Sequence, residues 1–337
     1  MNILITGCAG FIGFHLSKKL LNNKYRVIGI DNINSYYGTK IKYDRVKILK
    51  QFKKKFIFFK IDLKNKNKLE RIFNKYRINY VVNLAAQAGV RYSLINPDAY
   101  IDSNIRGFFN ILDVVKKFNI KHFVYASTSS VYGMNKKIPF SEDHSVDHPL
   151  QLYAATKRSN ELIAHAYSNI YKIPTTGLRF FTVYGPWGRP DMALYIFVKK
   201  ILENKKIEIF NFGKHVRDFT YVDDIIKGIQ KVIFKAPKQN NKIKTLKSSF
   251  SSSPFRILNI GNSKSVRLMD FIVEIEKNLN KKAKKKYLPL QKGDVVRTLS
   301  DTRKIKKLVG YKSNYNYKNG IKKFIDWYLE YYNYKKK

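Results

Sequence analysis

The glycine-rich turn TGCAGFIG, residues 6–13, is the feature that most constrains the fold of this chain. It follows a short apolar segment, residues 2–6, and leads into an amphipathic segment at about residues 11–21. Glycines at this spacing permit a tight turn, a close approach of the backbone to a ligand, and close packing of a helix on a strand. The helix N-terminus that follows attracts an anionic group such as a pyrophosphate. The stretch therefore predicts a strand–turn–helix unit that binds a dinucleotide, in preference to a packing loop without a ligand.

Apolar segments recur through the first half of the chain, and helical patterns separate them. The further expected strands cover residues 25–30, 56–63, 80–86 and 122–127, and the expected helices cover about 66–76 and 98–118. This alternation predicts βαβ units with right-handed crossovers. Because the strands are apolar throughout, both faces of the sheet should be covered. We expect an α/β fold with a Rossmann-type, doubly wound parallel sheet.

The pattern becomes less regular after about residue 183. Short strands (IEIF and RILNIG) alternate with helical patterns at about residues 191–204, 222–234, 266–280 and 318–332. Residues 235–255 are rich in Lys, Asn and Ser and predict a surface loop. We expect a cofactor-binding domain over residues 1–183 and a smaller, partly interleaved α/β substrate domain over residues 184–337.

The composition is strongly basic, with a formal net charge of +42 over 337 residues. Apolar residues make up 44% of the chain, which is enough for a full core. The basic residues are mostly lysines spread along the whole chain, whereas nucleic-acid binders usually show a clustered patch. We interpret the charge as compositional drift and expect no nucleic-acid partner. A positive field would still attract an anionic substrate.

The chain contains one cysteine, Cys8, so it cannot form an internal disulfide, and this fits a reducing compartment. No apolar run approaches the roughly 18 residues that a membrane span requires. The N-terminal stretch lacks the basic region of a signal peptide. We therefore expect a cytoplasmic protein without membrane association, and we assign no metal site.

Asp31 ends the second expected strand, eighteen residues after Gly13. A carboxylate there accepts hydrogen bonds from an adenosine ribose 2′-hydroxyl and repels a 2′-phosphate. The sequence therefore predicts NAD rather than NADP as the cofactor. We assign to the cofactor site Gly7, Gly10, Phe11, Ile12, Gly13, Asp31 and Asn32, with Asp62 and Leu63 at the end of the third strand.

Tyr153 and Lys157 lie four residues apart in YAATK, within a helical pattern, so they share one helix face. A tyrosine with a pKa of about 10 is a poor base, but a nearby ammonium lowers that pKa. Such a pair exchanges a proton with a sugar alcohol while hydride moves to nicotinamide. The spacing arises readily by chance in a chain rich in both residues. Its position after a fifth parallel strand, in a chain with a dinucleotide loop, favours the catalytic interpretation.

Three motifs together resemble the extended short-chain dehydrogenase/reductase family of nucleotide-sugar epimerases and dehydratases. They are TGCAGFIG, the hydroxyl row STSS at residues 127–130 before VYG, and YAATK. The resemblance covers essentially the whole chain. Within the family, LAAQAGVRYS (84–93) and TTGLRFFTVYGPWGRPDMA (175–193) are similar to the UDP-glucuronate 4-epimerases. The resemblance also implies a homodimer formed through the helices at about residues 98–118 and 150–170.

The resemblance implies roles for individual residues. It assigns Thr128, Tyr153 and Lys157 to catalysis. To the cofactor site it adds Ala85, Ala86 and Asn104, together with Tyr153 and Lys157. The UDP-sugar substrate site comprises Arg91, Thr128, Ser129, Ser130, Thr182, Arg189, Arg217, Gln291 and Asp294.

The hydroxyl row discriminates between reactions within that family. Dehydratases carry Asp-Glu directly after the Thr128 position, and decarboxylating relatives carry a glutamate at the Ser130 position. This chain has Ser129 and Ser130, whose hydroxyls can bind a substrate carboxylate. Thr182 stands where many relatives that bind neutral sugars have asparagine. The two serines could instead only cap the end of a strand.

These observations imply an NAD-dependent 4-epimerase that interconverts UDP-glucuronate and UDP-galacturonate through a transient 4-keto sugar. One alternative is a 4-epimerase of UDP-glucose or UDP-N-acetylglucosamine. An alternative of a different class is a non-catalytic, basic Rossmann protein that binds a nucleotide or RNA, since a fold alone does not give a function.

Overall fold

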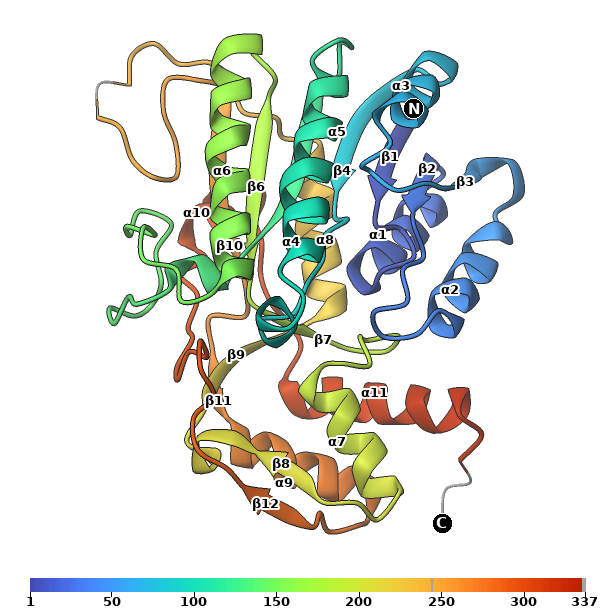
Figure 1. Cartoon of the computed structure of the whole chain (residues 1–337), viewed down its shortest axis with the longest axis vertical. Coiled ribbons are helices and arrows are strands. Elements are labelled where there is room, and N and C mark those ends of the chain that lie inside the picture. Colours follow the sequence, from blue (N-terminus) through green and yellow to red (C-terminus); the bar gives the residue numbers. More distant parts are fainter. Residues whose placement is uncertain (244, 335–337) are drawn as a thin grey trace.

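The computed structural model describes residues 1–243 and 245–334, and its larger part is a seven-stranded sheet (Figure 1). The strand order is β10-β6-β5-β4-β1-β2-β3, and all neighbouring strands run parallel. The strands are β1 (Asn2–Thr6), β2 (Arg26–Asp31), β3 (Phe56–Lys60), β4 (Ile78–Asn83), β5 (His122–Thr128), β6 (Thr175–Phe180) and β10 (Phe255–Ile260). The strand order reverses between β1 and β4, so the predicted doubly wound parallel sheet is confirmed.

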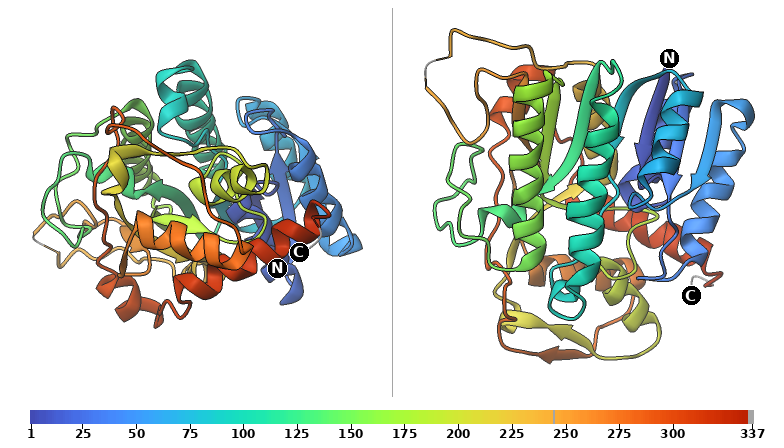
Figure 2. Two further views of the ribbon diagram at one scale, coloured as in Figure 1. Left: turned by 90° about the horizontal axis from the view of Figure 1, so that it is seen from below. Right: turned by 45° about the horizontal axis from the view of Figure 1, so that its top comes forward.

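Helices cover both faces of this sheet (Figures 1 and 2). Ile3 and Ile5 of β1 belong to one core cluster and the intervening Leu4 to another, as the two-residue period of a strand requires. The first cluster includes side chains of α1 (Phe11–Asn22), α2 (Lys40–Lys50) and α8 (Val222–Ile233). The second includes side chains of α3 (Lys66–Lys75), α5 (Gly107–Val115) and α6 (Leu152–Tyr171).

A smaller part lies beyond the carboxyl ends of the strands, at the bottom of Figure 1. One three-stranded sheet has the order β11-β9-β7, and a two-stranded sheet pairs β12 with β8. These strands are β7 (Thr182–Tyr184), β8 (Ile207–Ile209), β9 (Val216–Tyr221), β11 (Ser265–Arg267) and β12 (Lys285–Tyr287). The later helices are α7 (Ala193–Leu202), α9 (Leu268–Leu279), α10 (Arg303–Val309) and α11 (Tyr317–Tyr331).

The chain passes between the two parts more than once. Strand β10 and helix α8 belong to the large sheet and its covering layer, although they follow β7 and β9 in the sequence. The two parts are therefore interleaved, and the division at residues 183 and 184 stays an interpretation. The expected loop 235–255 carries no helix or strand before β10, and its residue 244, like residues 335–337, lies outside the described residues.

The expected helix at 98–118 is divided into three pieces. It begins as α4 (Asp98–Tyr100), continues as a π-helical segment, η3 (Ile101–Arg106), and ends as α5. A π-helical turn widens the helix by one residue and often marks a functional site. Here the segment contains Asn104, one of the predicted cofactor residues. Among the described residues, no helix has the length and apolar character that crossing a membrane requires.

A buried ion pair fixes α6 to the sheet. Arg179 of β6 and Glu161 of α6 are almost completely buried. Arg179 Nε and Nη2 donate to the two carboxylate oxygens of Glu161 at 2.8 and 2.9 Å. The hydroxyl of Ser127, on β5, donates to the same carboxylate at 2.6 Å. Because α6 also carries Tyr153 and Lys157, this network sets the position of both predicted catalytic residues.

We predict that Arg179→Leu lowers the free energy of unfolding by about 3 to 5 kcal/mol, because the buried Glu161 carboxylate loses its two-bond cation and keeps only Ser127 and a single contact with Arg158 at 3.2 Å. Urea denaturation followed by circular dichroism measures the change. The matched control is Lys117→Ala, which removes an exposed ion pair with Glu70 and should cost less than about 1 kcal/mol. A loss for Arg179→Leu no larger than the control would contradict the assignment.

Candidate active site

A cavity of about 600 Å³ lies at the carboxyl edge of the large sheet, between the sheet and the smaller part. This is the place where open α/β sheets bind their ligands. The cavity brings together all of the predicted site residues except Asn104. It is lined by Gly7, Gly10, Phe11, Ile12, Gly13, Asp31, Asn32, Asp62, Leu63, Ala85, Ala86, Arg91, Thr128, Ser129, Ser130, Tyr153, Lys157, Thr182, Arg189, Arg217, Gln291 and Asp294.

The glycine turn is tightly packed where the sequence predicted it to be. Gly7 has a φ of +70°, and a Cβ there would lie 2.8 Å from the backbone nitrogen of Ala85. A Cβ on Gly13 would lie 2.0 Å from the carbonyl oxygen of Gly7. The turn between β1 and α1 therefore requires both glycines, and it presents bare backbone and a helix N-terminus to the cavity. These groups fit a pyrophosphate.

The Asp31 carboxylate is positioned at the end of β2 by two backbone amides. It accepts hydrogen bonds from Ala9 N at 3.0 Å and from Ile33 N at 2.8 Å. Burial raises the pKa of Asp31, although these amides and the charges of Lys42 and Arg45 oppose the shift. The carboxylate lines the cavity beside the glycine turn. An acceptor for ribose hydroxyls next to a pyrophosphate cradle is the donor and acceptor set that NAD requires, so the residues present fit NAD.

Asn104 lies behind the wall of the cavity. Its side chain bonds both backbone groups of Gln87, with Gln87 N donating at 2.8 Å and Gln87 O accepting at 3.0 Å. The side-chain amide also donates to Thr156 at 3.1 Å. Asn104 thus positions Gln87, which does line the cavity, and the structure shows it as a support for the wall.

Thr128 and Tyr153 meet inside the cavity. Thr128 ends β5, and its side chain shares a hydrogen bond with Tyr153. The hydroxyl of Thr128 also accepts from Ser130 N at 3.2 Å, which turns the hydroxyl row into the short helix η4 (Ser129–Tyr132). Gln151 caps α6 by accepting from Ala154 N at 2.7 Å, so Tyr153 lies in the first turn of the helix.

Burial acts in opposite directions on the pKa values of Tyr153 and Lys157. Burial raises the pKa of Tyr153, while the hydrogen bond from Thr128 and the charge of Arg189 lower it. Burial lowers the pKa of Lys157 to about 8, and Glu161 opposes that shift. Arg189 is therefore a cation that acts on Tyr153 in this structure, and the role of Lys157 as its partner stays a prediction. Lys157 lies one turn further along α6, also lines the cavity, and is within reach of the Glu161 charge.

The far end of the cavity is cationic. Arg217 of β9 donates to Asp294 at 2.9 Å and to the carbonyl of Val296 at 2.8 Å. Arg91 stacks over the ring of Phe210 at 4.5 Å. The side-chain oxygen of Gln291 is buried without a recorded hydrogen-bond partner within the described part of the chain. Two guanidinium groups and a free acceptor suit the diphosphate and base of a nucleotide.

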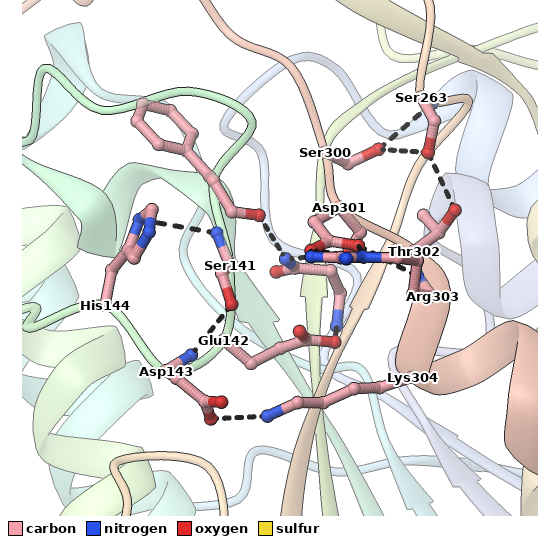
Figure 3. Close-up of polar contacts among 12 residues, drawn as sticks. Ser141, Glu142, Asp143, His144, Ser263, Ser300, Asp301, Thr302, Arg303 and Lys304 are labelled. Atoms are coloured by element: carbon pink, nitrogen blue, oxygen red, sulfur yellow. Dashed lines mark hydrogen bonds and ion pairs between the residues drawn. The ribbon is translucent and has the colours of Figure 1, made fainter.

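The segment that carries Gln291 and Asp294 is held firmly on its C-terminal side. Phe140 N donates to Leu299 O at 2.8 Å, and Asp301 N donates to Phe140 O at 3.0 Å. Figure 3 shows the side-chain contacts that follow, including the ion pair between Lys304 and Asp143. The nucleotide end of the cavity is thereby connected to the loop that follows the hydroxyl row.

Sequence reasoning missed several residues that line the cavity, among them Tyr36, Lys42, Gln87, Asp191 and His215. Tyr36 and Lys42 follow Asp31 within eleven residues, so their position after the second strand could have marked them as cavity residues. Asp191 lies inside the motif that carried the resemblance. Across residues 1–243 and 245–334, no group of three or more His, Cys, Asp or Glu side chains could hold a metal ion.

A family model described as GDP-mannose 4,6 dehydratase matches residues 4–324. The chain belongs to this family, within the extended short-chain dehydrogenases/reductases. Protein CapI of Staphylococcus aureus is a relative 51% identical over 334 residues, which cover 98% of this chain and 99% of CapI. The probable UDP-glucuronate 4-epimerase of Rhizobium meliloti is 43% identical over 335 residues and 98% of each chain.

A solved structure gives the same result for the fold of this short-chain dehydrogenase/reductase. The Bacillus cereus UDP-glucuronic acid 4-epimerase, in complex with UDP-glucuronic acid and NAD, matches with a TM-score of 0.88 and 34% identity. The match covers 98% of this chain and 100% of the other. The resemblance inferred from the motifs is confirmed.

We predict that Asp31→Ala lowers the NAD content of the purified protein by about tenfold or more. The variant loses the carboxylate that accepts hydrogen bonds from the ribose, and it loses the two hydrogen bonds from backbone amides that shape the turn. Release of the cofactor by denaturation, followed by chromatography, measures the content. The control is Asp270→Asn on α9, which removes an exposed ion pair with Arg267 of β11. Equal NAD content in the Asp31 variant and the control would contradict the ribose assignment.

Proposed function

We propose that this chain is an NAD-dependent epimerase that interconverts UDP-glucuronate and UDP-galacturonate by inverting C4 of the sugar. The observation that carries the proposal is the contact between Thr128 and Tyr153 in a cavity whose hydroxyl row has serines, not carboxylates, at positions 129 and 130. The named activities of the Rhizobium meliloti relative and the Bacillus cereus structure support it.

Tyr153 exchanges the proton of the sugar 4-hydroxyl. NAD held by the glycine turn and Asp31 would supply the hydride acceptor and donor for inversion at C4 of the sugar. Thr128 stabilises the Tyr153 phenolate by hydrogen bonding, and the positive charge of Arg189 acts in the same direction. Lys157 supplies a second cation close to the site on the same helix. Tyr153 then returns its proton to the inverted alcohol.

Ser129, Ser130 and Thr182 form the polar wall that the sugar faces. Their hydroxyls can bind the C6 carboxylate without offering a base that would remove the C5 proton. The 4-keto sugar therefore keeps its carboxylate and its C5 hydrogen during the cycle. Arg91, Arg217, Gln291 and Asp294 hold the UDP portion, around which the sugar turns.

The experiment that tests this proposal is an NMR time course of the purified protein with UDP-glucuronate and no added NAD. We expect UDP-galacturonate signals to grow to a constant ratio, because the cofactor is retained through the cycle. If only UDP-glucose or UDP-N-acetylglucosamine turned over, the uronate assignment would be wrong. Binding of RNA by a protein that contains no NAD would favour the non-catalytic alternative.

We predict that Tyr153→Phe lowers turnover by at least about 100-fold, the usual contribution of a general acid–base group. The ring remains packed edge-on against Tyr100, so the thermal melting temperature and NAD content should stay close to those of the unmodified protein. Full activity in this variant would exclude Tyr153 as the proton carrier.

We also propose a homodimer formed through the surface of η3, α5 and α6. This surface exposes apolar side chains, with Ile101 46%, Phe109 42%, Leu162 55% and Ile170 66% accessible. Apolar patches of this kind mark interaction surfaces. The single buried cysteine, Cys8, supports a cytoplasmic location, which we propose as well.

We predict that Leu162→Glu converts the dimer to a monomer, because it places a charge in an apolar interface. Size-exclusion chromatography with light scattering measures the mass. Val273 of α9, 53% exposed on another helix, provides the control variant Val273→Glu, which should leave the mass unchanged. A monomeric unmodified protein would refute the proposed dimer.

A further inference from the structure

Arg189, predicted to contact the substrate, is paired with a carboxylate inside the cavity. Arg189 Nε donates to Asp191 Oδ1 at 3.0 Å, and Nη2 forms an ion pair with Asp191 Oδ2. The two side chains are similarly accessible, at 21% and 22%. One edge of the guanidinium thus already faces a carboxylate, in the two-bond geometry that a uronate would also use.

Tyr36 holds the other partner of this pair. Its hydroxyl donates to Asp191 Oδ2 at 3.1 Å, and its ring lies 4.5 Å from that of Tyr92. Tyr36 belongs to the loop that follows Asp31, the predicted ribose ligand. Burial acts to raise the pKa of Asp191, but the Arg189 charge and these hydrogen bonds outweigh it and lower the pKa. Asp191 is therefore an anion that competes for Arg189.

The backbone ahead of Arg189 is fixed separately, by Arg45 of α2. The Arg45 side chain is fully buried and donates to three carbonyls. These are Ala9 O at 2.8 Å, in the glycine turn, and Trp187 O at 2.6 Å and Gly188 O at 3.3 Å, just before Arg189. With the backbone held against the glycine turn, the freedom that remains to Arg189 is the swing of its side chain.

We propose that Asp191, oriented by Tyr36, weakens the binding of Arg189 to the C6 carboxylate of the sugar. The weaker contact allows the 4-keto sugar to rotate in the cavity and present its other face. This inference rests on the proposed function, because it concerns the same substrate and the same site. Asp191 and Tyr36 are positioning residues, since they act on the substrate through Arg189.

The physical reason is that inversion at C4 requires the sugar to present both faces in turn to the same hydride carrier. If both donors on one edge of the guanidinium bound the sugar carboxylate, they would hold the sugar tightly in its first orientation. Those two hydrogen bonds would have to break before the ring could rotate. Binding energy of this kind stabilises the ground state and raises the barrier. A competing carboxylate at the same edge makes the contact exchangeable.

The test is Asp191→Asn, which keeps the shape of the side chain and removes its charge. We expect KM for UDP-glucuronate to fall by about 5- to 10-fold and kcat to fall by a similar factor, the scale of one charge-assisted hydrogen bond. Tyr36→Phe, which keeps the ring beside Tyr92, should shift both constants in the same direction by a smaller factor. A merely structural role would instead raise KM or lower kcat alone.

Binding without turnover provides an independent measurement. In the Tyr153→Phe background, calorimetry should show that Asp191→Asn tightens UDP-glucuronate and leaves UDP-glucose unchanged, because UDP-glucose has no C6 carboxylate. The matched control, Asp270→Asn, removes a similar two-bond pairing with Arg267 on the surface and should change neither affinity.

Unchanged or weakened UDP-glucuronate binding in Asp191→Asn would overturn the inference. If Asp191→Asn failed to fold, the same calorimetry would be done with Tyr36→Phe. An affinity for UDP-glucuronate equal to that of the protein with Tyr36 intact would then contradict the inference. Failure of the proposed function is a different result, namely that the unmodified protein does not turn over UDP-glucuronate at all. Even then, the difference in binding between the two UDP-sugars decides whether Asp191 restrains Arg189.

Discussion

The constraint on which this structure depends is that seven parallel strands end at the same edge of one sheet. Each strand leaves the sheet there and must turn into a helix or loop, so the polar side chains that follow the strands gather in one place. Asp31, Asp62 and Thr128 come to the cavity for this reason, each from a different strand end or the turn just beyond it. The glycine turn after β1 adds the helix N-terminus that a pyrophosphate needs.

Buried charges turn this shared edge into a site of defined geometry. Arg179 and Glu161 fix α6 across β5 and β6, and so place Tyr153 opposite Thr128. Arg45 joins the glycine turn to the loop before Arg189 by donating to backbone carbonyls of both. Both guanidinium groups are buried and each binds more than one partner across the fold, which suits a reaction in which hydride and proton travel over short, fixed distances.

The sequence was most informative where local chemistry and periodicity agree. The apolar strands β1 to β5, the glycine turn and the helix around Tyr153 could all be recognised, because each obeys a short-range rule. Strands β6 and β9 were missed because Arg179, Arg217 and Asp218 lie inside them, and charged residues predict exposure unless their partners are known. The support that Asn104 gives to Gln87 and the hydrogen bond from Tyr36 to Asp191 could not be predicted either, since each contact joins residues that are not neighbours in the sequence.

The interleaving of the two parts has a consequence for how the molecule moves. Strand β10 and helix α8 return to the large sheet after the chain has already built β7 and β9, so several separate segments cross between the parts. A single linker would act as a hinge and let the cavity open widely, whereas multiple crossings restrict the parts to small rocking displacements. The chain path itself therefore favours a cavity whose two walls keep a nearly constant separation.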